Sequence, residues 1–147
     1  MARIYVDMDG TIADFYGAII KRKESAKNDL EKNWPQSKVG FFLELKPIDG
    51  AIEAINILSL IKNHEVWFLT RPSFKNIHCY TEKAQWIQKY FGMQGLERLI
   101  LCGNKSLLKG DYLIDDTQID GQLEFEGVFI KIGSDKYPTW NEVLTVF

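Results

Sequence analysis

The sequence predicts an α/β fold, in which helical crossovers connect the strands of a parallel sheet. Five short runs rich in β-branched and aromatic residues alternate with longer stretches of helical periodicity. Charged and hydroxyl side chains follow four of these runs, at the position where open α/β sheets bind their ligands. The 147 residues are enough for one domain with a substantial core.

The apolar pattern predicts each element in order. Strands are expected over residues 3–7, 65–69, 98–101, 111–114 and 127–132, and helices over residues 15–32, 51–63, 81–91 and 139–146. The stretch 51–63 is apolar on nearly every side, which predicts a helix buried between two layers. Gly92 follows the third helical stretch in the position of a C-terminal stop.

Residues 13–47 interrupt the alternation of strands and helices. The segment begins as a charged helix and passes through Trp34 to the aromatic pair Phe41-Phe42. Because it lies between the first two strands, it would overhang the carboxyl ends of the sheet. We expect one domain over residues 1–147, with a core of residues 1–12 and 48–147 and a small lid over about 13–47. A long connection that contains a helix is the alternative interpretation.

Composition argues against several classes of partner. The formal net charge of −2 gives no overall field that attracts nucleic acid polymers or membrane surfaces. No apolar run approaches the roughly 18 residues that a membrane span needs, and no signal-peptide region precedes the first strand. Two cysteines are too few for a disulfide or zinc framework. These features predict a cytoplasmic protein whose partner is a small molecule.

The segment Asp7-Met8-Asp9-Gly10-Thr11 carries the strongest chemical signal. Its two aspartates are two residues apart at the end of an extended strand, so their side chains project to the same side. Two like charges this close are costly unless a cation lies between them or one carboxylate takes a proton. The pattern favours a carboxylate nucleophile, a neighbouring acid/base and a divalent metal. A turn with acidic, solubilising residues is the plainer interpretation.

Three further strand ends carry polar residues. Thr70 and Arg71 follow the second strand, Lys105 follows the third, and the pair Asp115-Asp116 follows the fourth. Taken singly, these residues could be a turn former, a solvated charge and an acidic turn. Together with the two N-terminal aspartates, at the carboxyl ends of adjacent strands, they favour phosphoryl transfer, which needs positioning and charge neutralisation.

Phosphoryl transfer gives each residue a role. Asp7 would attack phosphorus and form an acyl-phosphate. Asp9 would protonate the leaving alkoxide and then deprotonate the hydrolytic water. Mg²⁺, a hard cation that prefers oxygen ligands, would shield Asp7 from the anionic phosphate, and one carboxylate of the pair after the fourth strand would complete its site. Lys105 and Thr70 would hold the phosphoryl oxygens.

These residues resemble the four motifs of the haloacid dehalogenase superfamily of phosphatases. Within the superfamily, the chain is more closely similar to the 5′(3′)-deoxyribonucleotidases. The similar stretches are DMDGTIADF at 7–15, GFFLELKPIDGA at 40–51, YTEKAQWIQKYFG at 80–92 and GDYLIDD at 110–116. The resemblance therefore runs over most of the chain.

The resemblance implies a Rossmann-like parallel sheet with a small helical cap inserted after the first strand. It implies that Asp7 is the nucleophile and Asp9 the acid/base of a phosphoric monoester hydrolase. Thr70 and Lys105 match the phosphate-binding positions, and Phe15 matches an aromatic position that lines the nucleotide pocket.

The resemblance also implies a Mg²⁺ site. Its ligands would be the Asp7 carboxylate, the Asp9 backbone carbonyl and the Asp116 carboxylate, with Asp115 in support. The residues alone leave open which of the two adjacent aspartates ligates the metal directly.

The chain departs from the family pattern in two places. The motif threonine is usually followed by serine, but here by Arg71, which could add a bidentate phosphate contact or point to solvent. The inserted segment is shorter than in the animal enzymes, so Trp34, Phe41 and Phe42 are the candidates for stacking on a base. Packing at the junction of cap and core is the alternative role of the two phenylalanines.

The leading hypothesis is a Mg²⁺-dependent phosphatase that hydrolyses (deoxy)nucleoside monophosphates through a phosphoaspartate. The short insertion and Arg71 leave open another small phosphomonoester, such as a sugar phosphate, as the substrate. A nucleotide-binding module without catalysis is a third hypothesis, although every catalytic position is filled. An exposed edge of the insertion could also pair two copies in a homodimer.

Overall fold

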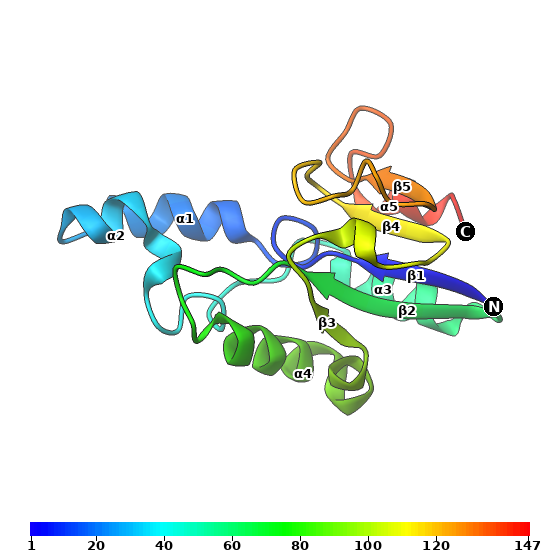
Figure 1. Ribbon diagram of the computed structural model, residues 1–147, viewed down its shortest axis with the longest axis horizontal. Helices are drawn as coiled ribbons and strands as arrows, with labels where there is room; N and C mark the ends of the chain where they lie inside the picture. The colour runs from blue at the N-terminus through cyan, green and yellow to red at the C-terminus, as the bar shows by residue number, and fades with distance from the viewer.

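The computed structural model describes all 147 residues and contains one five-stranded parallel sheet. The strands are β1 (Ala2–Val6), β2 (His64–Thr70), β3 (Leu99–Leu101), β4 (Tyr112–Asp115) and β5 (Val128–Lys131). Their order in the sheet is β3-β2-β1-β4-β5, so β1 lies between β2 and β4. All five predicted strands are confirmed, and the fold is α/β and Rossmann-like (Figure 1).

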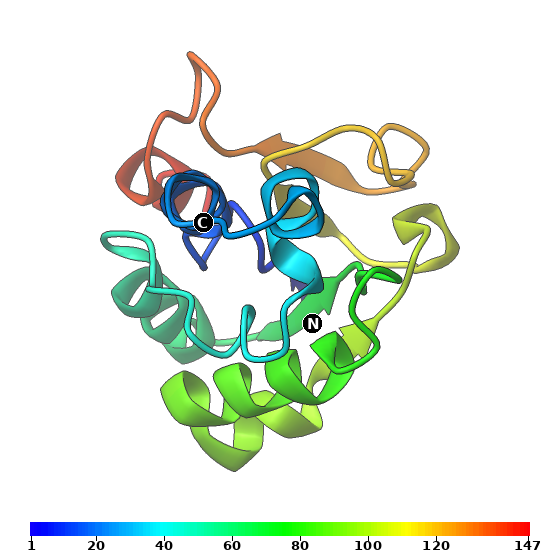
Figure 2. The same cartoon turned by 90° about the vertical axis from the view of Figure 1, so that its left-hand side faces the viewer.

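The helices complete the chain order of the fold. They are α1 (Phe15–Glu24), α2 (Asp29–Asn33), η1 (Pro35–Ser37), α3 (Ala51–Leu60), α4 (Cys79–Glu97), η2 (Lys105–Leu107) and α5 (Trp140–Leu144). One face of the sheet is covered by α3, α4 and α5, which contribute to a core cluster of 22 buried residues (Figure 2). The other face carries a cluster of four buried residues. No helix is both long enough and apolar enough to cross a membrane.

All four predicted helices differ in their bounds: the helices expected over 51–63 and 139–146 are shorter, α3 ending at Leu60 and α5 spanning Trp140–Leu144, and the other two differ more. The helix expected over residues 15–32 is two helices, because Ser25 caps the end of α1 and the Asn28 side chain caps the start of α2 by accepting from Glu31 N. In α4, Gly92 interrupts the helix at φ 67°, but helical turns resume and run to Glu97. The left-handed conformation that ends many helices therefore produces a kink here.

The prediction that the helix over residues 51–63 is buried between two layers is wrong. Only one side of α3 is buried, through Ala51, Ala54, Ile55 and Leu58. Leu60 is 85% exposed, because α3 forms an outer layer and nothing covers its far side. A helix in this position needs a single apolar face, and the remaining apolar residues lie in solvent.

Residues 13–47 leave the sheet and return to it at one place. Ala13 forms a bridge with Pro47, and Asp14 N donates to Lys46 O at 2.8 Å. Beyond these two contacts, α1 and α2 extend away from the sheet (Figure 1). Phe41 and Phe42 then bring the segment back into the main core.

Candidate active site

A cavity of about 650 Å³ lies at the carboxyl ends of the central strands. Most of the sequence-predicted site residues line it: Asp7, Asp9, Phe15, Trp34, Thr70, Arg71, Lys105 and Asp116. Because β1 pairs with both β2 and β4, the residues that follow these three strands meet at one edge of the sheet. Asp115 is fully buried and Phe41 does not line the cavity.

Lys105 joins two buried carboxylates. Its ammonium lies 2.5 Å from Asp7 Oδ1 and also pairs with Asp115 Oδ2. Asp115 accepts further hydrogen bonds from Gln122 Nε2 at 2.9 Å and from Thr117 N at 2.9 Å. Both oxygens of Asp115 are thus occupied by protein donors, which makes Asp115 the residue that fixes the Lys105 ammonium beside Asp7.

Burial governs the protonation of Asp7. Loss of solvent raises the pKa of its carboxyl to about 7, against the lowering effect of the Lys105 ammonium and with the help of the negative charges of Asp115 and Asp9. Burial lowers the pKa of Lys105, but attraction to the two carboxylates outweighs it and leaves the pKa above its usual value. In the protein alone, Asp7 therefore changes protonation near neutral pH.

The turn after β1 is shaped around Asp116. Thr11 Oγ1 donates to Asp116 Oδ1 at 3.3 Å, and the Tyr16 hydroxyl donates to Asp116 Oδ2 at 3.0 Å. Burial raises the pKa of the Asp116 carboxyl. Gly10 has φ 82°, and a Cβ at this position would lie 2.4 Å from Asp116 Oδ2. The glycine of the aspartate motif thus allows both the left-handed turn and the close approach of Asp116.

Lys83 of α4 is a site residue that the sequence analysis missed. Its ammonium, fully buried, donates to Asp9 Oδ2 at 2.8 Å, to Thr70 Oγ1 at 2.7 Å and to Arg71 O at 2.6 Å. Its three N–H groups therefore meet three acceptors from two separate strand ends. One signal could have found it, because Lys83 shares a helix face with Trp86, Ile87 and Tyr90, where a lysine is out of place unless it is paired.

Asp9 uses only one of its oxygens in the protein. Oδ2 accepts from Lys83, whereas Oδ1 is buried without a hydrogen-bond partner. A buried polar atom without a partner is rare and indicates a site completed by a ligand, an ion or water. Asp9 is also one of the residues that line the cavity.

The donor set fits a divalent cation. Carboxylate oxygens of Asp7, Asp115 and Asp116 lie within 4.8 Å of one another. The site as a whole contains four carboxylates and two buried ammonium groups, so two negative charges remain when all are ionised. Hard cations such as Mg²⁺ and Ca²⁺ prefer oxygen ligands of this kind. One divalent cation would neutralise the remaining charge.

The aromatic residues of the segment 13–47 divide between the cavity and the core. Phe15, Trp34 and Phe42 line the cavity. Phe41 is 1% exposed and packs edge-on against Phe15 at 5.6 Å between ring centroids. Phe42 is likewise 1% exposed, but it is the member of the predicted pair that borders this cavity, and Phe41 lies behind Phe15.

Arg71 lies at the mouth of the cavity. Its guanidinium pairs with Asp120, and its side chain is 44% exposed. Both residues line the cavity, so the ion pair joins the loops that follow β2 and β4. In the structure the arginine is therefore held by a carboxylate at the rim.

Glu82, beside Lys83 on α4, connects the inserted segment to the core. It is 4% exposed and accepts from Gly40 N at 2.6 Å and from Phe42 N at 3.1 Å. These bonds satisfy two backbone donors of the returning chain, which would otherwise be buried without partners. Glu82 thus positions Phe42 in the cavity wall.

Comparison with known proteins agrees with this geometry. The family model described as "5' nucleotidase, deoxy (Pyrimidine), cytosolic type C protein" matches residues 33–137. A protein of Vibrio phage KVP40 named "Putative 5'(3')-deoxyribonucleotidase" is 34% identical over 142 residues, which cover 97% of this chain and 82% of that protein. The human "5'(3')-deoxyribonucleotidase, cytosolic type" is 30% identical, with 97% of this chain and 78% of that protein covered.

The human mitochondrial 5'(3')-deoxyribonucleotidase is 29% identical over 97% of this chain and 69% of its own length. The family model covers β2 to β5 and begins at residue 33, after β1 and its two aspartates, whereas the matches to these relatives cover 97% of the chain. The chain therefore belongs to the cytosolic type C family of 5' nucleotidases, within the haloacid dehalogenase superfamily, and is a phosphoric monoester hydrolase.

Proposed function

We propose that this protein is a Mg²⁺-dependent phosphatase of (deoxy)nucleoside monophosphates that works through a phosphoaspartate on Asp7. The observation that carries the proposal is the environment of Asp7. This carboxylate lines the cavity beside Asp9 and is paired with a buried ammonium, that of Lys105. The arrangement gives a nucleophile, an acid/base and a fixed positive charge around one position for a phosphoryl group.

In the first step, a carboxylate oxygen of Asp7 attacks phosphorus and the bond from phosphorus to the ester oxygen breaks. Asp9 donates a proton to the leaving oxygen, so the nucleoside departs as a neutral alcohol. Asp9 Oδ1 is the oxygen for this role, because Oδ2 is held by Lys83 and Oδ1 has no partner in the protein. Lys105 offsets the negative charge on the phosphoryl oxygens.

In the second step, Asp9 removes a proton from water, and the water attacks phosphorus. The bond from phosphorus to the Asp7 oxygen breaks, which releases inorganic phosphate and restores the Asp7 carboxylate. Asp9 ends each cycle in its initial protonation state. Lys83 holds Asp9 and Thr70 in fixed positions through both steps, since its ammonium bonds to both side chains.

Asp7 and Asp116, with Asp115 in support, are the side chains proposed to hold Mg²⁺. When bound, the cation would neutralise the anionic phosphate and the carboxylates that face it. Tyr16 and Thr11 orient Asp116 for this role by donating to its two oxygens.

The segment 13–47 is proposed as the cap that recognises the substrate. It supplies Phe15, Trp34 and Phe42 to the cavity, and aromatic faces are suited to stacking on a base. The relatives are named as deoxyribonucleotidases, and this supports a nucleotide as the substrate. The cavity of about 650 Å³ is within the size range of small-molecule sites.

The test is phosphate release from a panel of 5′- and 3′-(deoxy)nucleotides and sugar phosphates, each with Mg²⁺ and with EDTA. We expect Mg²⁺-dependent release from deoxynucleotides such as dUMP or dTMP and little from sugar phosphates. An Asp7→Asn variant with a native circular dichroism spectrum should release none. Equal rates on both classes of compound would reject the substrate, and wild-type turnover by the variant would reject the mechanism.

A further inference from the structure

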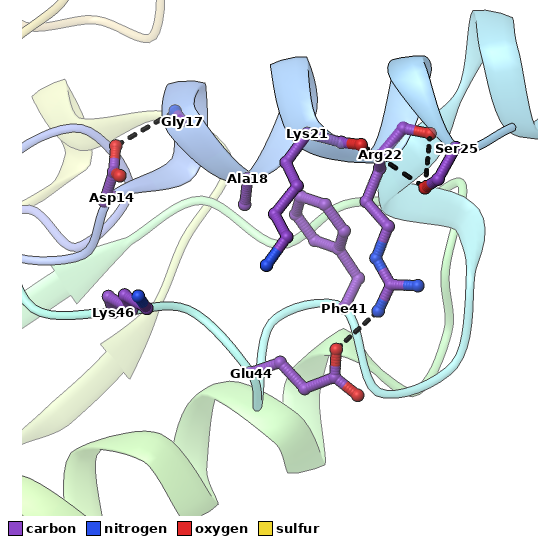
Figure 3. Close-up of a pocket in the computed structure, with 9 residues that line it drawn as sticks. All are labelled: Asp14, Gly17, Ala18, Lys21, Arg22, Ser25, Phe41, Glu44 and Lys46. Atoms are coloured by element: carbon purple, nitrogen blue, oxygen red, sulfur yellow. Dashed lines mark hydrogen bonds and ion pairs between the residues drawn. The ribbon is translucent and has the colours of Figure 1, made fainter.

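A second cavity, of about 430 Å³, lies between α1 and the chain segment that returns to the core. It shares no lining residue with the active-site cavity. In the close-up, Lys21 and Arg22 extend from α1 toward the segment that carries Phe41 and Glu44 (Figure 3). The mechanism proposed above uses no side chain of this cavity.

Three cations, those of Lys21, Arg22 and Lys46, and two carboxylates, those of Asp14 and Glu44, line this cavity, and they are only partly paired. Arg22 forms an ion pair with Glu44. The ammonium groups of Lys21 and Lys46 make no ion pair and no hydrogen bond, although both residues line the cavity. A helix side that faces the rest of its protein is usually apolar, but this side of α1 presents Lys21, Arg22 and Ser25 after the small Ala18.

The basic lining continues into an adjoining cavity of about 230 Å³. The two cavities share Arg22 and Ser25, and the second adds Lys27 and Lys38 together with one carboxylate, that of Glu31. The ammonium groups of these two lysines are also unpaired. We call the two cavities together the cap groove. Residues 13–47 contain seven Lys and Arg against five Asp and Glu, in a chain with a formal net charge of −2.

We propose that the cap groove binds a polyphosphate group, either free pyrophosphate or the phosphate chain of a nucleoside di- or triphosphate. Three cations line each cavity, against two carboxylates in the larger and one in the smaller, and this excess of cations suits an extended anion, because successive phosphates can each meet a different ammonium. The lining is predominantly polar, with Ala18 and Phe41 as the two apolar residues of the larger cavity. The phosphate chain therefore makes the main contacts.

Binding in the cap groove would affect the substrate pocket through α1. The first residues of this helix, Phe15 and Tyr16, line the active-site cavity, whereas Lys21 faces the groove one to two turns later. A ligand that contacts both Lys21 and Lys46 would fix α1 against the returning segment. This consequence for catalysis rests on the proposed function, but the binding itself does not.

Calorimetric titration of pyrophosphate into the protein in EDTA at low salt tests the binding. EDTA removes divalent cations, so the acidic active site repels the anion while the groove retains its lysines. We expect saturable binding that Lys21→Gln and Lys46→Gln each weaken by about fivefold to tenfold. Lys23→Gln is the matched control, because Lys23 is exposed on α1 and lines neither cavity. Asp7→Asn should bind pyrophosphate at least as well as the wild type.

Absent binding, or binding that all three lysine variants weaken equally, would overturn the proposal. A second titration, with a deoxynucleoside triphosphate, distinguishes free pyrophosphate from a nucleotide as the ligand. An affinity equal to that of pyrophosphate identifies the phosphate chain alone as the ligand, and a higher affinity identifies a nucleotide. Phosphate release by the wild type without added ligand tests the proposed function separately, so failure of one proposal is distinguishable from failure of the other.

Discussion

Replacement of Lys83 by methionine tests how the site holds its acid/base. The Lys83→Met variant keeps a side chain of similar length but removes a buried ammonium that donates to Asp9, Thr70 and the Arg71 carbonyl. Breaking a buried ion pair costs about 3–5 kcal/mol when the remaining charge is left alone. Asp9 is 21% exposed and can regain some solvent, so we expect a loss of about 2–3 kcal/mol in the free energy of unfolding.

The effect on catalysis should depend on the leaving group. A displaced general acid costs about 10²–10⁴-fold in rate when the leaving oxygen needs a proton. We expect kcat/KM of Lys83→Met to fall by about 100-fold for a deoxynucleotide and by much less for p-nitrophenyl phosphate, whose leaving group departs without a proton. The ratio of the two losses separates misplacement of Asp9 from general damage to the fold.

The matched control is Lys89→Met, on the same helix but exposed to solvent. It should change neither the unfolding free energy nor the ratio of the two rates. If Lys83→Met does not fold, Thr70→Val provides the second test, because it removes one of the three acceptors. Wild-type stability and an unchanged rate ratio in Lys83→Met would refute the positioning role.

Three further predictions concern the nucleophile, the motif turn and the aromatic wall. Because burial raises the pKa of Asp7 to about 7 in the folded protein, the folded state keeps a proton that the unfolded state releases above its ordinary pKa of 3.8. The contribution of Asp7 to the free energy of unfolding is thus lost as pH rises from about 4 to 7. The Tm of Asp7→Asn should therefore exceed that of the metal-free wild type by a margin that widens over this pH range. A margin that stays constant would contradict this prediction. Gly10→Ala places a Cβ against Asp116 at a positive φ, so it should lower Tm and weaken metal affinity measured by calorimetry, whereas unchanged affinity would show that the turn tolerates the methyl group. Phe41→Ala should lower the unfolding free energy by about 3–5 kcal/mol, whereas Phe42→Ala should also raise KM; equal KM values would remove Phe42 from the substrate wall.

The sequence was sufficient to predict the sheet and the strand ends. Short β-rich runs mark all five strands, and polar residues directly after them lie in one cavity because neighbouring parallel strands end at the same edge. Asp7, Thr70 and Asp116 could be found in this way. The helix bounds were harder to predict, because the cap at Asn28 and the kink at Gly92 depend on local backbone geometry.

Lys83 and Glu82 escaped prediction for a different reason. Each contacts residues far away in sequence: Lys83 bonds to Asp9 across 74 positions, and Glu82 bonds to the Gly40 amide across 42. Periodicity shows that a charged residue shares an apolar helix face, but not which buried partner it meets. The choice between Phe41 and Phe42 has the same origin, because the two rings contact each other and only the fold decides which of them borders the active-site cavity.

The central claim is that Asp7 carries the phosphoryl group during turnover. Acid quenching of the enzyme during steady-state turnover of a deoxynucleotide, followed by peptide mass spectrometry, tests it directly, because acyl-phosphates persist best in acid. We predict one phosphoryl group on the peptide that contains Asp7, present with Mg²⁺ and absent in EDTA and in Asp7→Asn. A phosphoryl group on another residue, or continued turnover by Asp7→Asn, would contradict the account.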